Sequence, residues 1–184
     1  MNRKLNITEL DRMSVDEFKH SRKIPLVVVL DDVRSMYNVG SVFRTSDAYR
    51  VECIYLCGIT ARPPHAEIHK TALGAEDSVD WLYFQNPEDA VMDLRRRGYR
   101  VMAVEQAEGS VSLPLPDHLF AEPPDGYGLV FGNEVKGVHQ HVIDLCDGCI
   151  ELPQYGTKHS LNVATTAGIV IWEMAKLFTL NFEL

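Results

Sequence analysis

The chain has 184 residues, 46% of them hydrophobic and 24% charged, a composition typical of one globular domain with a substantial core. Its formal net charge of −8 argues against a protein that binds nucleic acid over its whole surface, although a local basic face is compatible with this net charge. No apolar run approaches the roughly 20 residues of a membrane span, the N-terminus lacks a signal-peptide core, and four cysteines do not make a disulfide framework. We therefore expect a cytoplasmic protein that makes no use of a membrane.

The N-terminal residues 1–23 predict a polar arm with one short helix, which Ser14 caps, ahead of a single domain at 24–184. That domain opens with a β-branched run at 24–30, typical of a buried parallel strand. Strands and helices then alternate, with a polar, proline-rich stretch at 105–126. We expect further strands at 51–57, 79–84, 99–104, 128–131 and 149–152, and helices at 39–49, 68–73, 86–98, 138–145 and 161–178.

This alternation predicts an α/β fold with a mostly parallel sheet and helices on both faces. Three polar loops follow strands, within 30–48, 129–138 and 151–168. Ligands of open α/β sheets bind at the carboxyl ends of the strands, so the three loops can converge there into one composite site. The third loop ends where a long apolar helix begins, and such a helix start suits an anionic or carboxylate-bearing ligand.

The residues of these loops resemble known motifs. They are Asn38-Val-Gly40 followed by Arg44, then Phe131-Gly-Asn-Glu134-Val-Lys-Gly137, then Pro153 through Ser160-Leu-Asn162. In order and spacing they resemble the three motifs of the SpoU (TrmH-like) family of the SPOUT superfamily, whose members are S-adenosylmethionine-dependent RNA ribose 2′-O-methyltransferases. The resemblance spans 24–178, nearly the whole chain.

The resemblance implies several properties that composition and periodicity do not show. It implies a SPOUT methyltransferase fold with a C-terminal trefoil knot, which pattern reasoning alone would reject because knots are very rare. It also implies a homodimer with the site at the subunit interface, and S-adenosyl-L-methionine bound in a bent form within the knotted loops.

The resemblance assigns the central catalytic role to Arg44, the residue that activates the ribose 2′-hydroxyl. An arginine is almost always protonated, so we expect it to orient the hydroxyl and stabilise developing negative charge rather than act as a base. Spacing alone also allows a surface helix arginine that pairs with Asp47 at i+3.

The other candidate catalytic residues are Asn38, Glu134, Ser160 and Asn162. Spacing alone leaves a structural alternative for each: Asn38 as a helix N-cap, Glu134 as an acid near a helix start, and Ser160 or Asn162 as the cap of the last helix. The resemblance implies that Glu134 steadies the substrate loop and the partner subunit, and a pairing of Glu134 with Arg44 is a further alternative. For the cofactor, Gly132 lacks a Cβ, so a flat adenosine can approach its backbone. The resemblance places the cofactor against Val104, Gly132, Leu152, Ser160 and Leu161.

One rival motif is His139-Gln-His141 with Cys146-Asp-Gly-Cys149, which could bind zinc. A second cysteine pair is missing and Cys149 opens a predicted buried strand, so we expect no metal site. The leading function is therefore methylation of an RNA ribose, with tRNA preferred because the chain lacks the added RNA-binding domain of several ribosomal-RNA-modifying relatives. The alternatives are a ribosomal RNA 2′-O-methyltransferase, a non-catalytic RNA-binding dimer, and a redox or metal protein that uses Cys146 and Cys149.

Overall fold

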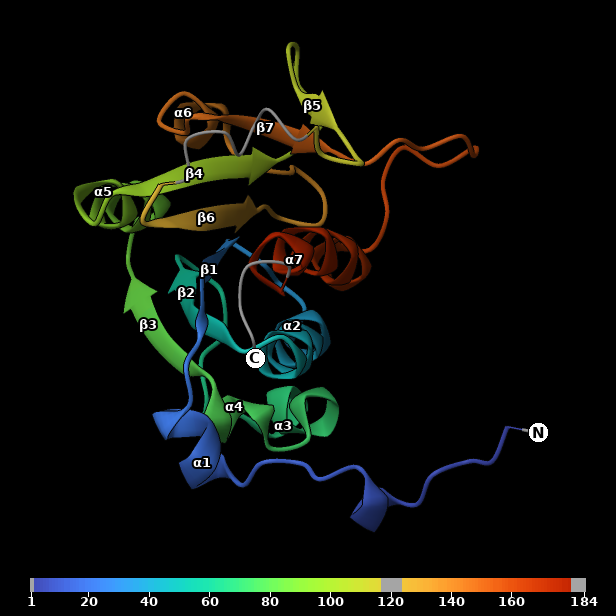
Figure 1. Cartoon of the computed structure of the whole chain (residues 1–184). Helices are drawn as coiled ribbons and strands as arrows, with labels where there is room; N and C mark the ends of the chain where they lie inside the picture. Colours follow the sequence, from blue (N-terminus) through green and yellow to red (C-terminus); the bar gives the residue numbers. More distant parts are fainter. Residues whose placement is uncertain (1, 117–123, 180–184) are drawn as a thin grey trace.

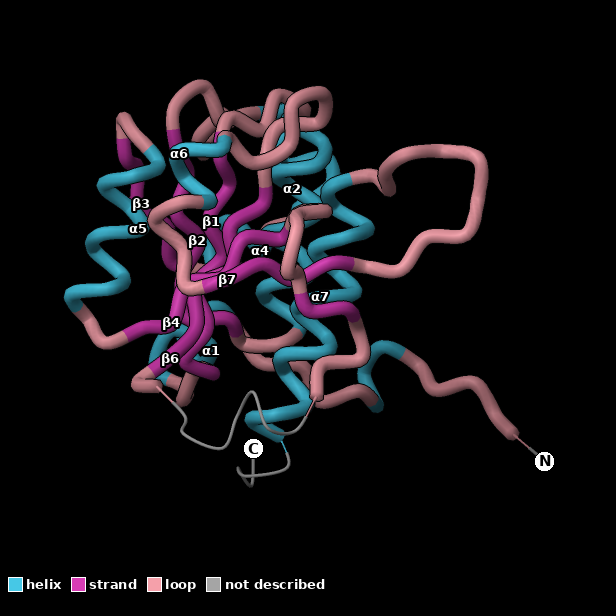
Figure 2. The backbone as a smooth tube through the Cα atoms, turned by 90° about the horizontal axis from the view of Figure 1, so that it is seen from above, coloured by secondary structure: helices cyan, strands magenta, loops and turns pink. Residues whose placement is uncertain are grey.

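The computed structural model describes residues 2–116 and 124–179, which form a seven-stranded sheet between two layers of helices (Figures 1 and 2). The strand order is β3-β2-β1-β6-β4-β7-β5, and every neighbouring pair is parallel. The strands are β1 (Ile24–Asp31), β2 (Val51–Cys57), β3 (Asp80–Phe84), β4 (Tyr99–Val104), β5 (Val111–Ser112), β6 (Gly126–Phe131) and β7 (Gly148–Glu151). The expected sheet is thus confirmed.

Each face of the sheet carries its own apolar core, because β1 and β6 are buried on both sides. One core packs against α1 (Val15–His20), α2 (Met36–Ala48), α3 (Ala66–Ala72), α4 (Ala75–Ser78) and α7 (Val163–Thr179). The other packs against α5 (Pro87–Arg96) and α6 (Gln140–Ile143). A short 3₁₀ helix, η1 (Ile7–Glu9), precedes α1. In the described parts of the chain, no helix combines the length and the apolar character needed to cross a bilayer.

The N-terminal arm contains the expected short helix. Ser14 caps α1 through a capping box with Glu17, as predicted. Phe18 of this helix is only 5% exposed and belongs to the core beside α2, so α1 packs against the domain. The division of the chain at residue 23 stays a prediction, as does the trefoil knot.

Several element boundaries differ from those expected. Helix α2 begins three residues early because the Ser35 hydroxyl caps it by accepting a hydrogen bond from the Asn38 N–H. Strand β5 lies in the stretch that we expected to be irregular, and it forms because Val111 pairs with Ile150 of β7. Helix α4 was not expected, and α6 is shorter than predicted.

Candidate active site

A cavity of about 480 Å³ opens at the carboxyl ends of the adjacent strands β6, β4 and β7. Its size is that of a site for a small molecule or cofactor. Its walls come from the strand ends, from the loop 132–138 after β6 and from the loop 152–162 before α7. The lining includes every residue predicted to contact the cofactor: Val104, Gly132, Leu152, Ser160 and Leu161.

Gly132 is needed for a reason that the sequence did not show. A Cβ at this position would lie 2.1 Å from the backbone of Gly137 and Val138, well inside van der Waals contact. The loop folds back on itself there, with reciprocal backbone hydrogen bonds of 3.0 and 2.8 Å between Asn133 and Gly137. The absence of a Cβ at Gly132 therefore allows the loop 132–138 to fold back on itself. The close approach of adenosine to the Gly132 backbone stays a prediction.

Glu134 fastens this loop to the start of α2. Its carboxylate accepts hydrogen bonds of 3.0 Å from the backbone N–H groups of Arg34 and Ser35 and from Asn38 Nδ2. Burial alone would raise the pKa of Glu134, but these donors outweigh it and hold the pKa below its ordinary value. The carboxylate thus binds these groups and not Arg44, which we had considered as a partner.

Asn38 and Asn162 connect α2 to α7. Asn162 Nδ2 donates to Asn38 Oδ1 at 3.0 Å, while Asn162 Oδ1 accepts from the N–H groups of Ala164 and Thr165. Asn162 is therefore the N-cap of α7, as one of our two alternatives predicted. The cap of α2 is Ser35, so the interpretation of Asn38 as a plain N-cap is wrong.

The two roles of Asn162 can be separated by substitution. Asn162→Ala removes both, and losing the cap is expected to lower the stability of the protein by roughly 0.5–2 kcal/mol. Asn162→Asp keeps an acceptor for the cap but loses the amide that donates to Asn38. We expect near-wild-type thermal stability and reduced methyl transfer for the aspartate variant, measured by melting curves and by turnover. Equal activity of Asn162→Asp and the wild type would show that the hydrogen bond to Asn38 does not contribute to turnover.

Arg44 stands apart from the cavity of its own chain. It is exposed on α2 and lines a second hollow of about 880 Å³, together with parts of the N-terminal arm and the α4 region. Its side chain makes no hydrogen bond or ion pair with any residue in 2–116 or 124–179. The alternative pairing with Asp47 is wrong, because Asp47 Oδ1 accepts from Ser78 Oγ at 2.5 Å instead.

Two further residues shape the cavity and were missed in the sequence. Glu105 accepts hydrogen bonds of 2.9 Å from the N–H groups of Val138 and Gln106, and Gln106 Nε2 donates to the His159 carbonyl at 2.9 Å. Together they tie the end of β4 to both loops of the cavity. The sequence did contain a signal for these two residues, because they form a polar pair directly after a predicted buried strand, at the sheet edge where ligands bind.

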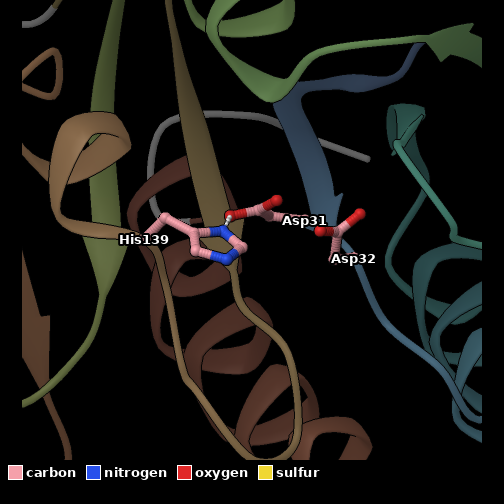
Figure 3. Close-up of side chains that lie close together, drawn as sticks. All are labelled: Asp31, Asp32 and His139. Carbon is pink, nitrogen blue, oxygen red and sulfur yellow. Dashed lines mark hydrogen bonds and ion pairs between the residues drawn. The ribbon is translucent and has the colours of Figure 1, made fainter.

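The rival histidines stack on each other, but among the described residues they form no group of potential metal ligands with Cys146 and Cys149. His141 lies 2.9 Å from Glu88, and His139 lies 3.2 Å from Asp31. The Cys146 thiol donates to the Val142 carbonyl, and burial raises its pKa to about 12, which disfavours the thiolate that a metal needs. His139 instead joins Asp31 and Asp32 in a separate cluster (Figure 3).

A parallel α/β sheet with a cavity between the loops 132–138 and 152–162, both of them hydrogen-bonded to the start of α2, defines a class of protein, and comparison with known proteins identifies the family. Residues 25–172 match the model of the SpoU rRNA Methylase family, so the chain belongs to that family. It is similar to a tRNA (guanosine(18)-2′-O)-methyltransferase of Aquifex aeolicus, with 29% identity over 85% of this chain and 72% of that protein.

Two other relatives extend the comparison. A 23S rRNA (guanosine-2′-O-)-methyltransferase RlmB of Neisseria meningitidis is 26% identical over 91% of this chain. The chain spans only 65% of that relative's length. Among solved structures, an AdoMet-bound rRNA methyltransferase from Sinorhizobium meliloti is 30% identical with a TM-score of 0.75, over 86% of this chain and 58% of that one. These similarities establish the SPOUT methyltransferase fold expected from the motifs.

Proposed function

We propose that this protein transfers the methyl group of S-adenosylmethionine to a ribose 2′-hydroxyl of RNA, with tRNA preferred over ribosomal RNA. The observation that carries the proposal is the convergence of Glu134, Ser160 and Asn162 on a cavity that also holds every expected cofactor contact. The names of the relatives support the reaction type. The tRNA preference is supported by the identity to the tRNA-modifying relative, 29% against 26% for the ribosomal-RNA-modifying one. We also propose a cytoplasmic location, where the protein would meet its RNA.

The cofactor is held by backbone and apolar groups around the cavity. Val104 offers an apolar wall, while the loops beside Leu152 and Leu161 offer backbone donors and acceptors for the adenine ring. S-adenosylmethionine is also found in the related Sinorhizobium meliloti structure. When bound, S-adenosylmethionine supplies an electrophilic methyl group. The residues of this chain position that group against the ribose and exclude water from the site.

Arg44 is the group that orients the ribose 2′-hydroxyl and stabilises the negative charge that develops on it. Since Arg44 lies outside the cavity of its own chain, the complete site needs a second subunit whose Arg44 reaches this cavity. We therefore propose a homodimer, as the family resemblance implies. The RNA phosphates would then meet exposed basic residues of the motif loops, such as Arg34 and Lys136.

The surface of α7 supports this assembly. Ile169 and Trp172 are 41% and 53% exposed, although both are large apolar side chains on a helix whose other side packs into the core. Ile171 and Met174 are buried in the chain's own core, so the proposed interface uses Ile169 and Trp172.

The purified protein is expected to bind S-adenosylmethionine and S-adenosylhomocysteine without added metal, since the described residues that line the cavity include no group of potential metal ligands. Isothermal titration calorimetry in the presence of a chelator measures this directly. One site per chain is the expected result. Failure to bind either compound would instead favour a non-catalytic RNA-binding dimer, and activity that a chelator abolishes and zinc or magnesium restores would contradict the metal-free mechanism.

A further inference from the structure

Three potential metal ligands gather at the carboxyl end of β1. Asp31 ends the strand, Asp32 follows it, and His139 directly precedes α6. One ligand atom from each lies within 4.8 Å of the other two. Figure 3 shows the Asp31 carboxylate between the imidazole of His139 and the carboxylate of Asp32. None of the three lines the cofactor cavity, so this is a separate cluster.

The Asp31 carboxylate is fully buried, but only one of its two oxygens has a hydrogen-bond partner among the described residues. Its Oδ2 lies 3.2 Å from His139 Nδ1, whereas its Oδ1 is buried without a hydrogen-bond partner in the described part of the chain. A buried carboxylate with an unpartnered oxygen costs free energy, and burial raises the pKa of Asp31 accordingly. This oxygen is therefore available to a cation, which would offset the cost.

We propose that Asp31, Asp32 and His139 bind one divalent transition-metal ion such as Zn²⁺. Two carboxylates and one imidazole suit an ion of this type, whereas Mg²⁺ and Ca²⁺ prefer oxygen ligands throughout. With bonds of about 2.1 Å, the ligand atoms of a tetrahedral ion lie about 3.4 Å apart. The 3.2 Å between Asp31 Oδ2 and His139 Nδ1 already fits this spacing, and since the three ligand atoms lie within 4.8 Å of one another, the remaining distances have to shorten by at most about 1.4 Å.

The position of the cluster indicates what the ion would do. Asp32 Oδ1 accepts from the Ile59 N–H at 2.9 Å, and the Asp32 carbonyl accepts from Asn133 Nδ2 at 2.8 Å. An ion on the cluster would therefore clamp the ends of β1 and β2 to the loop 132–138 and to the start of α6. Its role is structural, it lies outside the proposed methyl-transfer site, and it does not depend on the proposed function.

Zinc titration of the metal-stripped protein tests the site, with calorimetry for affinity and elemental analysis after gel filtration for stoichiometry. We expect one ion per chain and a higher melting temperature with zinc. His139→Gln and Asp31→Asn should each weaken zinc binding by about 10-fold or more. His141→Gln is the matched control, because His141 stacks on His139 but pairs with Glu88 and leaves the cluster intact.

Two results would overturn the site: no zinc bound at one ion per chain, or equal zinc affinity of His139→Gln and the wild type. Melting curves without zinc show whether each variant folds. His139 is partly exposed and tolerates substitution better than the buried Asp31, so His139→Gln decides the question if Asp31→Asn fails to fold.

Discussion

Replacing Arg44 by alanine is expected to lower the rate of methyl transfer by about 10²-fold or more, the scale of losing a positioned charge-stabilising group. Binding of S-adenosylmethionine should change little, because Arg44 lies outside the cavity. Folding should also be unaffected, because the side chain is exposed and makes no hydrogen bond within the described residues. Single-turnover rates and calorimetry measure the two effects separately.

Arg96→Ala is the matched control, since it removes the same charge from α5 on the opposite face of the sheet. It should keep wild-type turnover, and wild-type turnover in Arg44→Ala would refute the catalytic assignment. Hybrid dimers test whether Arg44 serves the partner's cavity. A subunit with Arg44→Ala is combined with a subunit whose cofactor binding is weakened by Gly132→Ala, at a cofactor concentration too low to fill the Gly132→Ala cavity. This hybrid should regain activity if the site is shared, and stay inactive if each chain works alone.

Gly132→Ala is expected to weaken binding of S-adenosylmethionine by roughly 10- to 100-fold, equivalent to an overpacking cost of about 1–3 kcal/mol. The added methyl group meets backbone atoms of Gly137 and Val138 at 2.1 Å, so no side-chain rotation can relieve the clash. The loop 132–138 must move, and it forms one wall of the cavity. Calorimetric affinity and the melting temperature of the variant report the change.

Gly156→Ala is the control for this prediction, because Gly156 lies in the other loop of the cavity and a Cβ there would meet nothing within 4 Å. This variant should bind the cofactor as the wild type does. If Gly132→Ala retained full affinity, the tight fold of the loop around Gly132 could not be a determinant of the site.

The sheet and its layers were predictable because they rest on local patterns. Runs such as 24–30 are apolar and β-branched enough to identify a buried strand, and Asn86-Pro87 marks the start of α5 clearly. Helix boundaries were harder to predict where a motif residue is also a good N-cap. Both Ser35 and Asn38 are good caps, and only the fold shows that Ser35 takes this role while Asn38 turns to Glu134 and Asn162.

The site was predicted as a set of residues, but its connections were not. Glu105 accepts a hydrogen bond from Val138, 33 residues away, and Gln106 donates one to His159, 53 residues away. Neither contact therefore leaves a periodic signal in the sequence. The family resemblance grouped Arg44 with the other motif residues. Its separation from the cavity depends on the direction in which α2 presents it, which spacing alone does not determine.

Incubation of the wild-type protein with S-adenosylmethionine that carries a labelled methyl group and with undermodified tRNA or, in parallel, ribosomal RNA tests the central claim most directly. Each RNA is then digested to nucleosides and analysed by mass spectrometry. We predict label on one nucleoside species, with the extra methyl group on the ribose and not on the base. Absence of labelled tRNA and of labelled ribosomal RNA, or a label confined to the base, would contradict the proposed 2′-O-methyl transfer.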